Sequence, residues 1–273
     1  MKKRKRSNHN NTEKKPFSGN AAKRRRDIQA HDTISLYGFH AVQAALMNPK
    51  RVCHKLQLTK NAHHELHATL EKMPHKLTPE IVTPDQLKKQ LPDGTVHQGV
   101  MLETQPLDEP ELESLVATGR PLVILDQVTD PRNIGAILRS ATVFGAAGLI
   151  TTRHHSPIAA GALAKAASGA LEVTPICAVG NLARCLKTLA QAGYLTIGLD
   201  ETGNRTIAEL PQNMPIALVM GAEGKGLRRL TKENCDELVR LPHADQTGSQ
   251  FTTLNVSNAA AVSLYAVFMN AGD

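Results

Sequence analysis

The second half of the chain alternates short apolar runs with helical patterns, and this alternation restricts its fold more than any other feature. The run PLVILDQV (121–128) is almost continuously apolar, as expected of a parallel strand buried on both faces. Further strands are predicted at 148–152, 173–179, 194–200, 215–221 and 235–242, and helices at 132–144, about 159–169, 181–193 and 257–269. Strands that alternate with helices predict an α/β fold built on a doubly wound parallel sheet.

The first half has the pattern of a smaller α/β unit. Residues 34–49 predict a short helix that ends at Asn48-Pro49. Strands are predicted at 54–60, 80–84 and 99–104, and helices at 61–73 and 85–91. We therefore expect a small domain over 30–105, a linker rich in proline and acidic residues over 106–120, and a second domain over 121–273.

The positive charge of the chain is concentrated at its start. Residues 1–26 contain eleven Lys or Arg and one acidic residue, Glu13, whereas all 273 residues carry a formal net charge of +7. The body of the protein is therefore slightly acidic, and the basicity belongs to a tail, 1–29. Such a segment buries too little apolar surface to fold alone, and basic arms of this kind bind polyanions. We expect contact with nucleic acid; a solvated leader is the alternative.

Other features exclude several classes of protein. No run approaches the roughly 20 apolar residues that a membrane span requires, and the basic start has no apolar core like that of a secretory signal. We expect a cytoplasmic protein without a membrane segment. Four scattered cysteines form no CxxC pair, so reduced thiols are expected. His63, His64 and His67 do not form HExxH, and no metal site is predicted.

The first of three polar segments is DQVTDPRNIGAILRSATVFGA (126–146). Asp130 and Pro131 have the residue types of a helix N-cap and its first position. Asn133 then falls in the first turn. Arg139 falls about 140° around the helix from the start of the apolar stripe, so it points away from the core. By itself, Arg139 could equally be an ordinary exposed arginine.

The other two segments come later in the chain. IALVMGAEGKGL (216–227) is a predicted strand that enters a glycine-rich loop around Glu223. This loop matches neither GxGxxG nor a Walker P-loop, so it is weak evidence for phosphate binding. In LPHADQTGSQFTTLNVSNAAAVSLY (241–265), a strand end leads into a polar loop, and Asn255 and Ser257 open the last helix.

In this order and spacing, the three segments resemble the three motifs of the SpoU family of SPOUT RNA methyltransferases. The similarity extends to 154–176 and to GFHAV (38–42), and thus covers nearly everything after residue 30. It is greatest to members that methylate guanosine in bacterial large-subunit ribosomal RNA, with transfer-RNA enzymes next. The resemblance implies a C-terminal parallel-sheet domain with a trefoil knot. It also implies a small N-terminal domain, like ribosomal protein L30e, that binds RNA.

The resemblance further implies transfer of a methyl group from S-adenosyl-L-methionine (SAM) to a ribose 2′-hydroxyl of structured RNA. The alternatives are a transfer-RNA substrate or a non-catalytic RNA-binding protein that keeps the fold. The catalytic positions of the motifs correspond to Asn133, Arg139, Glu223 and Asn255. The cofactor-binding positions correspond to Gly198, Gly221, Leu241 and Leu254. Family proposals make the arginine a general base, but a guanidinium stays protonated in proteins. We expect Arg139 to stabilise the developing alkoxide, with Glu223 as the rival candidate for the base.

The chain departs from the family pattern at two places, both in the third segment. Thr253 stands where the family usually has serine, and the loop 243–251 is longer than usual. The family acts as dimers, and the last helix, 257–269, has no charged side chain. A helix that is apolar on every side is buried, so we expect this one to pack against a second subunit, with an intramolecular groove as the alternative.

Overall fold

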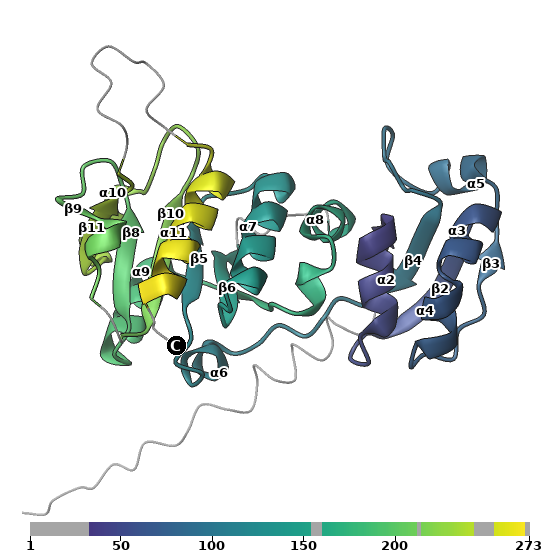
Figure 1. The fold of residues 1–273 in the computed structure, drawn as a ribbon, viewed down its shortest axis with the longest axis horizontal. Coiled ribbons are helices and arrows are strands. Elements are labelled where there is room, and N and C mark those ends of the chain that lie inside the picture. The colour runs from purple at the N-terminus through teal and green to yellow at the C-terminus, as the bar shows by residue number, and fades with distance from the viewer. Residues whose placement is uncertain (1–32, 154–159, 212–213, 243–253, 271–273) are drawn as a thin grey trace, which may run out of the picture. The chain divides into compact units, whose positions relative to one another are not determined.

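The computed structural model describes residues 33–153, 160–211, 214–242 and 254–270. Thr33–Asp273 belongs to one compact unit that contains two sheets (Figure 1). The first sheet has the strand order β1-β4-β2-β3, with bounds Ile34–Tyr37, Val100–Thr104, Cys53–Leu58 and Glu80–Ile81. Its helices are α2 (Phe39–Met47), α3 (Lys60–Glu65), α4 (His67–Lys72) and α5 (Pro84–Lys88). Leu36, Leu46, Leu56 and Leu102 lie fully buried in the core that these elements share.

The helix predicted over 34–49 is wrong for its first four residues. Ile34–Tyr37 forms β1, which pairs antiparallel with β4, and only Phe39–Met47 is helical. Gly38 separates the two elements with φ 92°, a left-handed backbone angle that favours glycine. The partner strand lies more than sixty residues away along the chain, so local periodicity could not indicate this pairing.

The second sheet confirms the predicted doubly wound parallel fold. All its seven strands pair in parallel, in the order β7-β6-β5-β10-β8-β11-β9. In chain order the strands are β5 (Leu122–Asp126), β6 (Gly148–Thr152), β7 (Ile176–Val179), β8 (Leu195–Leu199), β9 (Arg205–Thr206), β10 (Ile216–Gly221) and β11 (Glu237–Arg240). The helices are α6 (Leu112–Val116), α7 (Pro131–Val143), α8 (Ala160–Ala167), α9 (Leu182–Gln191), α10 (Arg229–Asn234) and α11 (Val256–Asn270), with 3-10 turns at Ala170–Glu172 and Ile207–Glu209.

Helices cover both faces of this sheet, which is why β5 is apolar along its whole length. Val123 and Leu125 face a core shared with α7, α8 and α11, whereas Leu122 and Ile124 face a core shared with α9. All four side chains are 0–1% exposed. Figure 1 shows α7 and α11 side by side on one face of the sheet. In folds of this kind, ligands bind at the carboxyl ends of the strands.

Several short elements were not predicted from the sequence. α10 and the two-residue strand β9 were not predicted, because neither is long enough to show a hydrophobic period. The predicted linker, 106–120, contains the short helix α6, whose Leu115 is buried against the second sheet. The predicted loop 243–251, Thr253 and the basic tail lie outside the described residues, so the trefoil knot stays a prediction.

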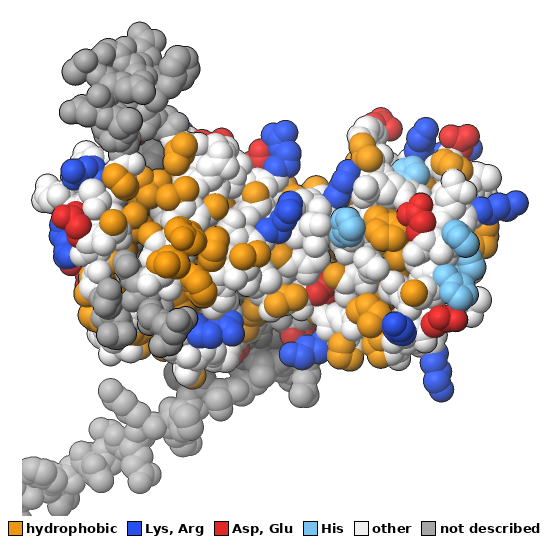
Figure 2. Space-filling view, in the orientation of Figure 1, with side chains coloured by type: hydrophobic (Ala, Val, Ile, Leu, Met, Phe, Trp, Pro, Cys, Tyr) orange, Lys and Arg blue, Asp and Glu red, His pale blue; other side chains and the backbone are white. Residues whose placement is uncertain are grey.

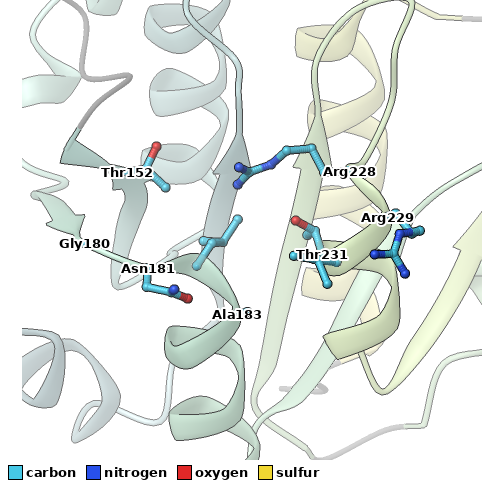
Figure 3. A pocket seen from close by; sticks show the side chains of 9 residues that line it. Thr152, Gly180, Asn181, Ala183, Arg228, Arg229 and Thr231 are labelled. Carbon is cyan, nitrogen blue, oxygen red and sulfur yellow. The ribbon is translucent and has the colours of Figure 1, made fainter.

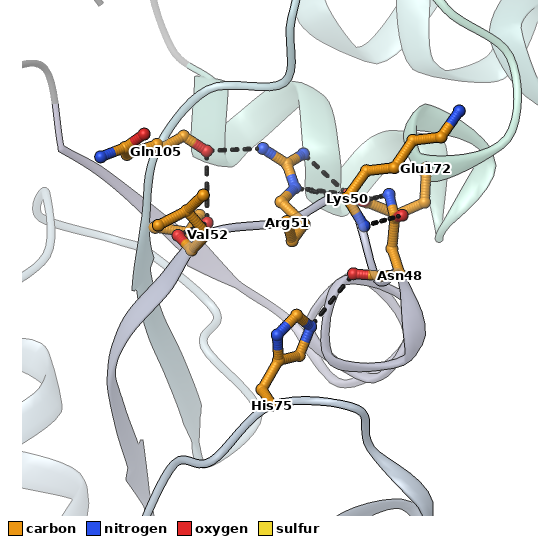
Figure 4. Close-up of polar contacts among 8 residues, drawn as sticks. Asn48, Lys50, Arg51, Val52, His75, Gln105 and Glu172 are labelled. Carbon is orange, nitrogen blue, oxygen red and sulfur yellow. Dashed lines mark hydrogen bonds and ion pairs between the residues drawn. The ribbon is translucent and has the colours of Figure 1, made fainter. Parts of the chain in front are cut away.

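A buried ion pair joins two segments that are far apart in the sequence (Figure 4). Arg51 donates from Nη2 to Glu172 Oε1 at 2.7 Å, and its Nε also bonds this carboxylate. The Arg51 Nη1 donates to the backbone oxygen of Gln105, and Asn48 Nδ2 donates to Glu172 Oε2 at 2.7 Å. The two charged side chains are only 1% and 6% exposed. This cluster therefore compensates both buried charges with several directed hydrogen bonds.

The cysteines are unpaired thiols, as predicted. Burial raises the pKa of Cys177 to about 11 and the pKa values of Cys185 and Cys235 to about 12, and it also raises the pKa of Cys53. Only the thiolate reacts with disulfide reagents, and at pH 8 these raised pKa values keep the thiols protonated. We expect Ellman's reagent at pH 8 to titrate most of the four cysteines only after unfolding in urea. A rapid reaction of two or more in the native protein would contradict this.

Candidate active site

The local structure at the start of α7 agrees with its sequence. The Asp130 carboxylate accepts a hydrogen bond from the Arg132 backbone N–H at 2.8 Å, and Pro131 occupies the first helical position. The apolar stripe of this helix is 0–1% exposed: Ile134, Ile137, Leu138 and Ala141. Asn133 is consequently held in the first turn, beside the carboxyl edge of the sheet.

Three of the four predicted catalytic residues converge around one amide group. Asn255 Nδ2 donates to Asn133 Oδ1 at 3.2 Å and to Glu223 Oε1. The other side of this amide, Asn255 Oδ1, accepts from the backbone N–H of Ser257 at 2.9 Å and from its hydroxyl at 2.6 Å. Asn255 thereby caps α11 and fixes its own orientation. Residues 122 positions apart in the chain thus form one polar cluster at the surface.

Arg139, the fourth predicted catalytic residue, does not join this cluster. It is exposed on α7, on the side away from the apolar stripe, as predicted. It forms no hydrogen bond or ion pair with any residue that the structure describes. It lies six positions after Asn133, which corresponds to roughly 9 Å along the helix axis and a different side of the helix. None of the described residues therefore holds its guanidinium in place.

The loop that carries Glu223 is a tight turn, and steric constraints explain why glycine occupies several of its positions. Gly221 ends β10, and a Cβ atom there would lie 2.3 Å from the carbonyl carbon of Gly226. The backbone folds back on itself, because the Gly226 N–H donates to the Ala222 oxygen at 2.8 Å. Gly224 and Gly226 have φ angles of 74° and 63°, which favour glycine. The sequence GAEGKG therefore forms a compact turn that presents Glu223 at the sheet edge.

The predicted cofactor-binding residues fall into two groups. Gly221, Leu241 and Leu254 lie just where β10 ends, where β11 ends and where α11 begins. They therefore lie near the carboxyl edge of the sheet, and Leu254 is 55% exposed. Gly198 instead lies buried within β8, where a Cβ would approach the side chains of Leu227 and Leu238 to below 3 Å. Core packing explains why this position is glycine, and its predicted contact with a cofactor stays a prediction.

The three edge positions fit a nucleoside cofactor. Backbone groups at the carboxyl end of a parallel sheet can bond the polar edge of a purine, and the exposed Leu254 offers apolar surface to its ring. Among the residues described, no cluster of His, Cys, Asp and Glu could hold a metal ion. No described helix has both the length and the apolar character needed to cross a membrane.

A cavity of about 460 Å³ lies near the same sheet edge, on the side of α9 and α10 (Figure 3). It is lined by Thr152, residues 180–183 and residues 228–231. None of the predicted catalytic or cofactor-binding residues lines it, so the polar cluster lies outside this cavity. The Arg228 side chain lies across its upper part in Figure 3.

One pair of residues at this edge was missed by the sequence analysis. The Asp126 side chain is fully buried and bonds Arg228 twice: the Arg228 Nε donates to Oδ1 at 2.6 Å, and the Arg228 backbone N–H donates to Oδ2 at 3.0 Å. The sequence does contain a signal for it. An acidic residue that ends a buried apolar strand needs a charged or hydrogen-bonding partner.

Comparison with protein-family models gives two matches to this chain. Residues 120–265 match the SpoU rRNA Methylase family, and residues 35–110 match the RNA 2′-O ribose methyltransferase substrate binding family. This chain belongs to the SpoU rRNA methylase family. The resemblance found in the sequence is thus confirmed, and so is the presence of an N-terminal substrate-binding domain.

Relatives and solved structures agree with this SpoU assignment. The 23S rRNA (guanosine-2′-O-)-methyltransferase RlmB of Pseudomonas aeruginosa is 40% identical, and the match covers 85% of this chain and 94% of that protein. An uncharacterized tRNA/rRNA methyltransferase of Synechocystis is 34% identical over 89% of this chain, which spans 65% of that relative's length. The SpoU methyltransferase AviRb from Streptomyces viridochromogenes, solved in complex with AdoMet, shares the fold with a TM-score of 0.72 and 24% identity. That structural match covers 92% of this chain and 93% of AviRb.

Proposed function

We propose that this SpoU family protein transfers the methyl group of SAM to the ribose 2′-hydroxyl of a guanosine in large-subunit ribosomal RNA. The observation that carries the proposal is the convergence of Asn133, Glu223 and Asn255 at the carboxyl edge of the sheet. The RlmB relatives, at 36–40% identity over most of the chain, support the rRNA substrate. Ribosomal RNA as substrate would also agree with the cytoplasmic location expected from the sequence.

The chain supplies positioning and charge in this reaction. SAM, held by the backbones at Gly221, Leu241 and Leu254, would supply an electrophilic methyl group. Displacement at that group requires the attacking oxygen to be in line, so orientation of the ribose provides much of the rate enhancement. Asn255 holds the Glu223 carboxylate and the Asn133 amide in fixed positions, where they can accept or donate hydrogen bonds to ribose hydroxyls.

Arg139 has a different role in this scheme. Its guanidinium remains positively charged at neutral pH and is exposed, so it can approach an RNA phosphate and the developing alkoxide. The hydroxyl proton would then pass to the phosphate or to a water molecule. The small domain over 30–105 would bind the RNA, with the basic tail adding affinity without sequence preference.

The function is tested by two measurements on the full chain. Isothermal titration should show stoichiometric binding of SAM by the pure protein. Mapping of 2′-O-methyl groups in RNA from cells with and without the protein should show one guanosine of large-subunit rRNA that depends on it. A dependent site in transfer RNA would favour the transfer-RNA alternative. Absence of SAM binding would favour a non-catalytic RNA-binding protein.

We infer further that the protein is a homodimer through α11. One side of this helix is buried in its own domain, including Ala260, Leu264 and Val267. The other side remains exposed and apolar, and Figure 2 shows the hydrophobic surface over α11 and α7. The exposed large side chains are Val143, Val262, Tyr265, Phe268 and Met269, each at least 47% exposed. Contiguous apolar surface of this kind marks a protein interface, and a second copy of the same helix is the occupant that we propose.

Charge placed on this surface should separate the subunits. We expect sedimentation to give a dimer for the wild type and a monomer for Tyr265→Glu, because the interface would have to bury an unpaired carboxylate. Val96→Glu is a matched control, since Val96 is also exposed and apolar (62%) but belongs to the small domain. A monomeric wild type, or a dimeric Tyr265→Glu protein, would refute the interface.

A further inference from the structure

We infer that Asp126 and Arg228 are positioning residues that hold the Glu223 loop in its catalytic position. This inference rests on the proposed function, since it concerns the geometry of the same site. It starts from the two ends of the loop 222–227. At one end, Gly221 is the direct parallel partner of Asp126 in the pairing of β10 with β5. At the other end, Arg228 bonds the Asp126 carboxylate. One residue of β5 thus anchors both ends.

The two bonds from Arg228 restrain different parts of this residue. The bond from its backbone N–H to Oδ2 fixes the main chain immediately after the loop, and the bond from Nε to Oδ1 fixes the side chain. Asp126 is fully buried, whereas the Arg228 side chain is 44% exposed. Burying a carboxylate without hydrogen-bond partners costs free energy. The folded protein therefore strongly favours the arrangement in which Arg228 donates both hydrogen bonds to Asp126.

Within the loop, only Leu227 is buried in the core, so the segment 222–226 depends on contacts at its ends and on the bond between Asn255 and Glu223. The loop 222–227 contains two glycines, Gly224 and Gly226, and glycine gives the backbone wide conformational freedom. Its internal bond from Gly226 N–H to the Ala222 oxygen closes the turn but does not tie it to the sheet. Glu223 is exposed, and its carboxylate accepts a hydrogen bond from Asn255, which lies outside the loop at the start of α11. The anchor at Asp126 therefore acts together with the buried Leu227 and the bond to Asn255 to position the turn, and with it Glu223, relative to Asn133.

The test compares Arg228→Ala, Arg228→Lys and Asp126→Asn with Arg229→Ala in the full chain. Arg229 is a matched control, because it is the next residue, its side chain is 79% exposed, and it forms an ion pair with the exposed Glu233. We expect Arg228→Ala to lower kcat by about tenfold to a hundredfold with a smaller change in KM for RNA, because misplacement of a catalytic group by about 1 Å has effects of this size. Arg228→Lys should recover part of the loss. Asp126→Asn should behave like Arg228→Ala, since its amide N–H₂ would face a donor.

A second measurement does not depend on activity. Hydrogen exchange of the Gly226 amide should be about tenfold faster in Arg228→Ala than in Arg229→Ala, because local opening of the turn becomes easier. The inference is overturned if Arg228→Ala keeps kcat within twofold of Arg229→Ala, or if it only melts at a lower temperature with unchanged kcat. If Arg228→Ala fails to fold, Arg228→Lys provides the same comparison. If the wild type transfers no methyl group, the proposed function fails, and the exchange rates still decide whether Arg228 holds the turn.

Discussion

Replacing Glu172 with alanine is expected to lower the free energy of unfolding by about 3–5 kcal/mol, because it leaves the Arg51 guanidinium buried without its counter-charge. Arg51 is only 1% exposed, so water cannot replace the lost carboxylate without a structural change. Asn48 would lose its acceptor as well, which adds a second unsatisfied polar group. In a protein of this size, such a loss lowers the melting temperature by roughly 10 °C.

The matched control for this change is Glu233→Ala. Glu233 also pairs with an arginine at 2.7 Å, but the side chains of Arg229 and Glu233 are 79% and 50% exposed. Exposed pairs of this kind contribute less than about 0.5 kcal/mol, so urea and thermal unfolding should scarcely distinguish this variant from the wild type. The double variant Arg51→Ala/Glu172→Ala should lose less than the sum of the single losses, because it removes both charges. A loss below 1 kcal/mol for Glu172→Ala would show that the pair contributes little.

Replacing Arg139 with alanine is expected to lower kcat for RNA methylation by about 10²–10³-fold, the usual effect of removing one group that stabilises an oxyanion. Stability should be unchanged, since Arg139 is exposed and bonds none of the residues described. The affinity for SAM should also be unchanged, because the predicted cofactor positions lie on other elements. Arg184→Ala, which removes an exposed arginine from α9, should retain nearly full activity.

The conservative variants decide between the two candidate roles. Arg139→Lys keeps the positive charge but loses the planar fork that bonds two oxygens at once, so we expect it to remain strongly impaired. Glu223→Gln keeps the shape of the side chain and removes its charge. If Arg139→Lys retains most of kcat while Glu223→Gln abolishes it, Glu223 is the base and the role proposed for Arg139 is wrong. Single-turnover rates with saturating SAM separate this chemical step from binding.

The parts of the fold that were predicted correctly are those whose information is local. The run 121–128 indicated a doubly buried strand, and α7 follows both its N-cap signal and its apolar stripe. β1 was missed because its strand character comes from β4, which is distant in the sequence. Catalytic candidates came from the family resemblance, since nothing in the spacing of Asn133, Glu223 and Asn255 indicates that one amide joins them.

Buried ion pairs between distant segments could not be predicted from the sequence for the same reason. Arg51 and Glu172 are 121 positions apart, and each has the residue type of an ordinary surface position. Asp126 and Arg228 are 102 positions apart. Only the apolar strand that precedes Asp126 indicates that its carboxylate is buried. Pairs of this kind depend on how helices and strands pack together, and neither hydrophobic periodicity nor turn residues in the sequence indicate that packing.

The strand order also determines at what stage of translation the catalytic site can form. β5 pairs with β10, which is made more than ninety residues later, and the cluster needs Asn255 from the start of the last helix. A nascent chain that has reached only β8 contains Asn133 and Arg139 but neither the central strand of its sheet nor the amide that joins the cluster. Such non-local pairing folds slowly, and it delays competence until almost the whole domain has left the ribosome. The site therefore cannot be complete before β10 and Asn255 have been synthesised.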